Sequence, residues 1–149
     1  MRSSRLYSAS AALIAALFLA TACASGSGGG ITVSAAWARP TVGVDKPTGA
    51  YLTIANTSGQ ADALLSVSSP AASSVEIHET STDQSGMTGM HPISRIDVAA
   101  GATVKLQPGG LHLMISGPTR SLQVGDRLEL DLVFERAGTI VVSAEIREG

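Results

Sequence analysis

Short runs of alternating apolar and polar residues constrain the fold of this chain more than any other feature. From residue 31 onward, clusters of Gly, Pro, Asn, Asp and Ser interrupt these runs about every ten residues. Such a pattern is typical of half-buried strands joined by tight turns. We therefore predict an all-β fold, an antiparallel β-sandwich or barrel, with no amphipathic helix, no internal repeat and no second domain.

The predicted strands follow the limits of the alternating runs. They span residues 31–37, 50–56, 63–68, 74–79, 90–92, 103–106, 111–116, 127–135 and 139–146. Because successive side chains of a strand point to opposite faces, the alternation also assigns directions. Around Leu113 it turns His112 and Met114 away from the core, and around Ile77 it turns His78 away. We expect these three side chains to face outward.

The N-terminal residues indicate export. Arg2 and Arg5 precede an apolar run over 9–22, which is shorter than the roughly 20 residues of a membrane-spanning helix. A basic start, a short apolar centre and small residues before a cleavage site are typical of a secretory signal peptide. We assign residues 1–22 to such a peptide and expect an extracytoplasmic protein.

Cys23 is the one cysteine of the chain and directly follows Ala20-Thr21-Ala22. We interpret it as the lipid-bearing first residue of a mature lipoprotein; the alternative is ordinary cleavage that leaves a free terminal cysteine. Residues 23–30 are then a Gly/Ser tether, which such a composition makes flexible. Residues 31–149 form the folded domain, anchored to the cell membrane in the periplasm or at the cell surface.

Charge and motifs exclude several function classes. With 10 Lys and Arg against 12 Asp and Glu, the chain lacks the basic surface of a nucleic-acid-binding protein. No Gly-x-Ser-x-Gly elbow and no phosphate-binding glycine loop after a strand is present, so we do not expect an enzyme.

All three histidines, and all three methionines other than Met1, lie between His78 and Met114. Imidazole and thioether are neutral donors, and the thioether is soft, so together they favour Cu(I). Zinc sites recruit a thiolate, a third histidine or a carboxylate, and calcium sites need oxygen clusters. A blue-copper site needs a cysteine within the domain. The composition therefore predicts a Cu(I) site.

For several individual residues the sequence leaves open whether they bind the metal or have another role. His112 and Met114 form the strongest pair, since the strand period places them on one face. Met90 is favoured as a ligand over a packing role, whereas for Met87 the two roles are balanced. His91 is interpreted as a polar surface residue. Glu76 is interpreted as an exposed charge, with a role in orienting the imidazole of His78 as the alternative.

Five segments resemble the PCuAC family of periplasmic copper chaperones over nearly all of residues 31–147. They are Ala36-Trp37-Ala38-Arg39-Pro40, Gly49-Ala50-Tyr51-Leu52, Val75-Glu76-Ile77-His78-Glu79-Thr80, Met87-Thr88-Gly89-Met90 and Pro108-Gly109-Gly110-Leu111-His112-Leu113-Met114. In this family a methionine is followed, after 21 intervening residues, by His-x-Met. Met90, His112 and Met114 have this spacing in full. Between His78 and Met90 there are 11 residues where the family has ten, which is consistent with one extra residue in a hairpin loop.

The resemblance implies a cupredoxin-like β-sandwich that binds Cu(I) through His78, Met90, His112 and Met114, with Met87 as the alternative to Met90. It also implies delivery of copper to the dinuclear copper centre of cytochrome c oxidase, alongside a thioredoxin-like copper protein. Two other functions fit the sequence: a copper-sequestering resistance lipoprotein, and a surface interaction module that binds no metal.

Overall fold

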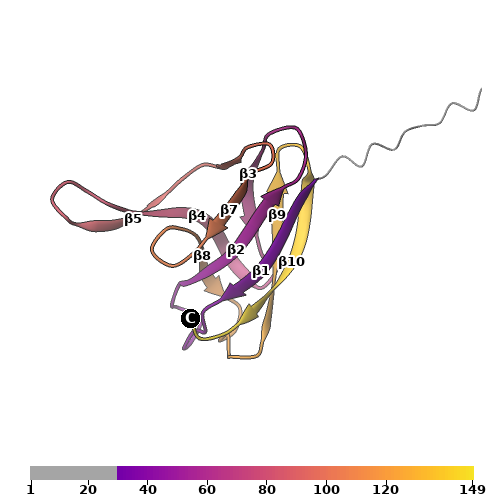
Figure 1. The fold of residues 1–149 in the computed structure, drawn as a ribbon. Helices are drawn as coiled ribbons and strands as arrows, with labels where there is room; N and C mark the ends of the chain where they lie inside the picture. The colour runs from indigo at the N-terminus through magenta and orange to yellow at the C-terminus, as the bar shows by residue number, and fades with distance from the viewer. Residues whose placement is uncertain (1–29) are drawn as a thin grey trace, which may run out of the picture.

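The computed structural model describes residues 30–149, which form ten strands and no helix (Figure 1). The predicted signal peptide, Cys23 and all of the predicted tether except Gly30 lie outside the described residues. Within 30–149 there is consequently no helix of the length and apolar character needed to cross a membrane. The strands are β1 (Ile31–Ala38), β2 (Thr48–Asn56), β3 (Asp62–Ser68), β4 (Ala72–Thr82), β5 (Thr88–Pro92), β6 (Ile96–Val98), β7 (Thr103–Leu106), β8 (Leu111–Pro118), β9 (Arg127–Phe134) and β10 (Gly138–Ile146).

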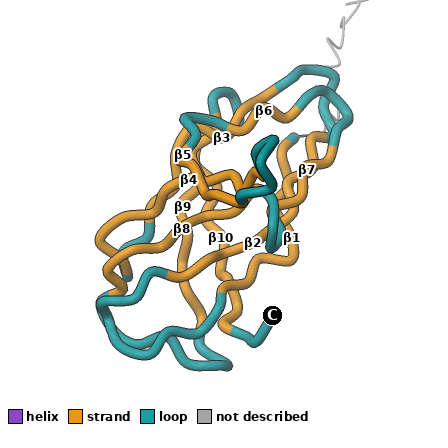
Figure 2. Tube along the Cα trace, turned by 90° about the vertical axis from the view of Figure 1, so that its left-hand side faces the viewer, coloured by secondary structure: helices purple, strands orange, loops and turns teal. Residues whose placement is uncertain are grey.

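Seven strands close on themselves in the order β4-β8-β2-β1-β10-β9-β3, because β3 also pairs with β4 through Val67 and Val75. The remaining strands extend this closed sheet: β5 pairs with β4, β6 with β3 and β7 with β2. In Figure 2 the strands, in orange, and their connecting loops, in teal, account for the whole described chain. The predicted all-β sandwich is confirmed, with the addition that it is closed.

One pairing departs from the predicted antiparallel arrangement. β1 and β10 run parallel, with Trp37 opposite Glu145 and Ala38 opposite Ile146. A bulge in β1 precedes this segment, where the register with β2 shifts between Ser34 and Trp37 and Ala35 has a positive φ of 51°. A bulge bends its strand and increases the local twist. It thereby helps the end of β1 reach β10.

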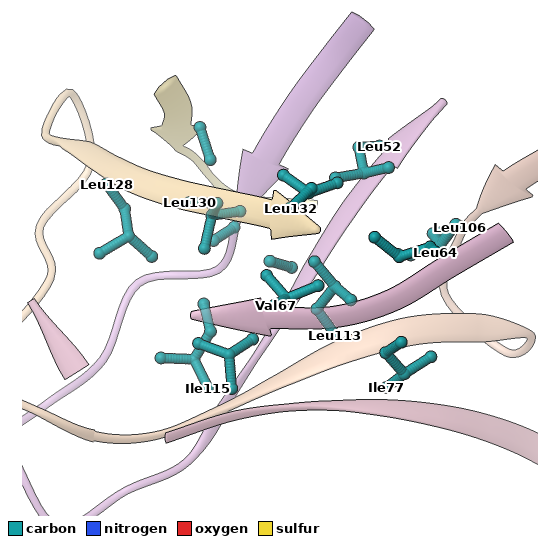
Figure 3. Close-up of a cluster of buried hydrophobic side chains, with 14 of the residues drawn as sticks. Leu52, Leu64, Val67, Ile77, Leu106, Leu113, Ile115, Leu128, Leu130 and Leu132 are labelled. Atoms are coloured by element: carbon teal, nitrogen blue, oxygen red, sulfur yellow. The ribbon is translucent and has the colours of Figure 1, made fainter. Parts of the chain in front are cut away.

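The core fills the inside of the closed sheet with leucine, isoleucine and valine side chains (Figure 3). Leu113 and Ile115 of β8 contribute from one side, and Leu130 and Leu132 of β9 from the other, all with 0% exposure. Because alternate residues of each strand point inward, the residues between them are presented on the outer face. On β4 and β8 that outer face carries His78, His112 and Met114.

Candidate metal centre

His78 and His112 lie side by side on neighbouring strands. They are direct cross-strand partners in the β4–β8 register, and their ring centroids are 5.7 Å apart. Two residues along, Met114 of β8 lies opposite Glu76 of β4 and opposite Gly49 of β2. The sheet register therefore brings together two imidazoles and one thioether that are far apart in the sequence.

Each histidine has one ring nitrogen engaged with an acceptor. The Nδ1 of His112 is 2.9 Å from the carbonyl oxygen of Gly110, and the Nε2 of His78 is 3.1 Å from Oε2 of Glu76. A carbonyl or carboxylate oxygen can only accept, so in each neutral ring the engaged nitrogen carries the proton and donates. The lone pairs then belong to Nε2 of His112 and Nδ1 of His78.

Those two nitrogens are the buried side-chain nitrogen or oxygen atoms that lack a hydrogen-bond partner within residues 30–149. An unpartnered buried polar atom costs about 1–3 kcal/mol, and such exceptions in a folded protein call for an explanation. Two of them on adjacent rings, both carrying lone pairs, form a ready pair of metal-binding nitrogens. A bound cation would supply the missing partner for both.

The methionines complete the set of soft donors. An open cleft of about 470 Å³ is lined by His112, Met114 and Met90, together with residues of β2 and of the loop before β8. Met90 belongs to β5, where it pairs with Thr80 of β4 and so shares the face on which His78 lies. No group of three or more His, Cys, Asp or Glu side chains within the described chain could hold a metal. The soft donors that line the cleft beside His112 are the thioethers of Met90 and Met114.

Burial differs from the expectation for one of the histidines. His112 does point away from the core side chains of β8, but it is buried, with 4% exposure, rather than solvent-facing. Strand period reports only which side of the sheet a residue occupies. Here Tyr51 and the loop residues Pro108 and Gly109 line the same cleft and form a second layer over that side. His78 is also largely covered, with 14% of its side chain exposed, whereas Met90 is 60% exposed.

The aromatic wall of the cleft depends on a glycine. A Cβ atom at Gly49 would lie 2.7 Å from the hydroxyl oxygen of Tyr51, so the missing side chain gives the tyrosine ring its place. Trp37 packs on that ring with centroids 4.5 Å apart, and the Arg147 guanidinium lies 4.8 Å from the Trp37 centroid. These residues were not among the predicted site residues. The signal that could have found them is the strand period, which places Gly49 and Tyr51 on one face.

The other candidates have different surroundings. Met87 lines a separate hollow with His91, and not the cleft that contains His112 and Met114. His91 pairs with Glu79 of β4, on the face of the hairpin opposite Met90, in keeping with its interpretation as a surface residue. Glu76 is 59% exposed, as its interpretation as a surface charge predicts. It nevertheless contacts the imidazole of His78, which is the alternative role stated above.

Comparison with known proteins places these features in a family context. The model of the family described as "Putative lipoprotein LpqE-like" matches residues 31–146. The Lxx21020 protein of Leifsonia xyli subsp. xyli, which carries a lipoprotein name, is 30% identical over 119 residues, or 80% of this chain and 70% of the relative. An uncharacterised protein of Rickettsia prowazekii, RP573, is 27% identical, and the chain spans 62% of its length.

Solved structures share the fold. The copper-bound PCuAC domain from PmoF2 superposes with a TM-score of 0.68, covering 82% of this chain and 96% of that domain, at 24% identity. The Cu(I) form of DR1885 from Deinococcus radiodurans is 31% identical with a TM-score of 0.57, covering 80% of this chain and 76% of that protein. The chain therefore has the cupredoxin-like fold of PCuAC domains.

Proposed function

Since this chain belongs to the LpqE-like lipoprotein family and has the PCuAC-type fold, we propose that it is an extracytoplasmic metallochaperone that carries Cu(I). The observation that carries the proposal is the pair of buried, unpartnered nitrogens on His78 and His112. We propose these two atoms, with the thioethers of Met90 and Met114, as the four ligands. Such a set is neutral and soft, as Cu(I) prefers.

Met90 is favoured over Met87 as the hairpin ligand. Met90 lines the same cleft as His112 and Met114, whereas Met87 lies in the other hollow. The copper form of a relative at 31% identity supports the monovalent state of the cargo. The lipoprotein description of the family supports a lipid anchor at Cys23 and a location at the outer side of the cell membrane.

Unequal exposure of the ligands suggests how the cargo leaves. Thiolates bind Cu(I) more strongly than thioethers, so the cysteines of an acceptor can displace the methionines without any change of oxidation state. Met90 is 60% exposed and is proposed to exchange first, while His112, at 4%, is released last. We propose as acceptor the dinuclear copper centre of cytochrome c oxidase, with a thioredoxin-like copper protein as partner. The protein then acts as a carrier and not as an enzyme.

The test of this function is a transfer experiment. The purified protein is titrated anaerobically with Cu(I) against a chromogenic chelator, and is expected to bind one equivalent. It is then mixed with a soluble apo fragment of the oxidase copper-site subunit, and copper is expected to move to the fragment, read from its absorption. Binding without transfer would support sequestration instead. Failure to compete for Cu(I) at all would remove the copper proposal.

We expect Glu76 to orient His78 by accepting the Nε2 proton, which leaves Nδ1 free for the metal. Glu76→Ala is expected to weaken Cu(I) binding about tenfold to a hundredfold, the usual effect of losing such a partner. Glu76→Gln keeps an acceptor oxygen and is expected to stay near wild type. Nitrogen NMR of the copper-free protein reports the His78 tautomer directly.

The control for that variant is Glu79→Ala, which removes an exposed carboxylate from the opposite face of the same strand. Equal affinities for Glu76→Ala and Glu79→Ala, with an unchanged His78 tautomer, would contradict the proposed role.

A further inference from the structure

Met87 and His91 are potential metal ligands that the cleft does not use. Together with Asp83 they line a second hollow, of about 220 Å³, on the β4–β5 hairpin. The hairpin extends away from the closed sheet, to the left in Figure 1. Because Met90 pairs with Thr80 and His91 pairs with Glu79, the strand period places His91 on the face opposite Met90. This hollow is therefore separate from the cleft.

The absence of a side chain at Gly89 leaves room for the imidazole of His91. A Cβ atom at Gly89 would lie 3.1 Å from Cε1 and 3.4 Å from Nε2 of the His91 ring, so the ring occupies space that a side chain would take. Gly89 itself lines the hollow. Among the hydrogen bonds within residues 30–149, none involves the His91 ring. Its nitrogens are therefore available to a ligand.

A carboxylate is held at the tip of the same hairpin. Oδ1 of Asp83 accepts hydrogen bonds from the backbone N–H and the hydroxyl of Ser85 and from the N–H of Met87, at 2.9, 2.6 and 3.0 Å. The hydroxyl of Ser85 and the amide of Met87 hold the pKa of Asp83 below its ordinary value. Within the described residues Oδ2 has no hydrogen bond, so one oxygen of an ionised carboxylate remains free beside Met87.

We propose that Asp83, His91 and Met87 form a second metal site, which binds Cu(II). Imidazole and carboxylate suit Cu(II), the divalent first-row ion that such donors bind most tightly, and a thioether serves it as a weak additional ligand. The neutral histidine and methionine donors of the cleft favour Cu(I), whereas this exposed hollow contributes a negative charge and leaves room for water ligands. The inference stands on residues outside the cleft and does not rest on the proposed function.

The test uses electron paramagnetic resonance, because Cu(II) is paramagnetic and Cu(I) gives no signal. One equivalent of Cu(II) is added to the purified His112→Ala/Met114→Ala variant, in which the cleft is disabled. We expect a bound signal with coupling to one imidazole nitrogen. Introducing His91→Ala into this variant is expected to weaken Cu(II) binding at least about tenfold. Losing a residue that only contacts a metal ligand already costs about tenfold to a hundredfold in metal affinity, and a direct ligand should contribute no less. Asp83→Asn keeps the acceptor oxygen of the turn, removes the charge, and is expected to weaken binding as well.

Thr82→Ala is the control, since it removes the 3.0 Å hydroxyl contact with Thr88 and perturbs the hairpin without removing a metal donor. Its Cu(II) affinity should equal that of its parent. An imidazole signal that persists unchanged in the His91→Ala variant would overturn the proposal. So would a signal that is present in the wild type but absent whenever His112 is replaced, because the Cu(II) would then lie in the cleft.

Discussion

Replacing His112 and Met114 together by alanine is expected to lower the Cu(I) affinity by at least about a hundredfold, since each direct ligand should contribute at least the roughly tenfold effect of an outer partner. His112 brings the buried Nε2 that has no partner among residues 30–149, and Met114 brings a thioether to the same cleft. Competition with a chromogenic Cu(I) chelator under anaerobic conditions measures the change.

The matched control is the His91→Ala/Met87→Ala variant. It removes the same two residue types from the other hollow, so the chain loses equal numbers of imidazoles and thioethers. We expect this variant to retain the Cu(I) affinity of the wild type. Equal losses in the two variants would show that the histidines and methionines bind copper as loose surface donors and not in the cleft. Circular dichroism checks that both variants are folded.

Leu113→Ala, at the position between those two residues, is expected to lower the free energy of unfolding by about 2–5 kcal/mol, as is typical for a leucine removed from a core. Leu113 has 0% exposure and packs inside the closed sheet (Figure 3). Urea unfolding of the copper-free protein measures the loss, because the free energy falls linearly with denaturant.

Val141→Ala is the comparison for Leu113→Ala. Val141 lies on β10 and is 56% exposed, so its truncation is expected to change the free energy of unfolding by no more than about 0.5 kcal/mol. Losses of similar size in the two variants would contradict the assignment of Leu113 to the core. At urea concentrations below the unfolding midpoint, both variants should retain the Cu(I) affinity of the wild type, since neither side chain reaches the cleft.

Much of the fold could be predicted from local pattern. Each of the nine predicted strands is present, because alternation over a run of residues reports a half-buried strand without knowledge of its partners. β6 was missed, since Ile96-Asp97-Val98 is too short to establish a period. The parallel β1–β10 pair and the closure of the sheet could not be predicted either. Both depend on which distant strands meet, and on the bulge at Ala35.

The sequence by itself determined the types of donor and the side of each strand on which they lie. Clustering of histidine and methionine indicated a soft metal site, and the period of two turned His112 away from Leu113. Only the tertiary structure decided that His112 is buried, that Glu76 contacts His78, and that Met90 and Met87 belong to different hollows. The physical reason is that periodicity records a direction relative to a strand, whereas burial and ligand contacts depend on strands and loops that are remote in sequence and packed against that face.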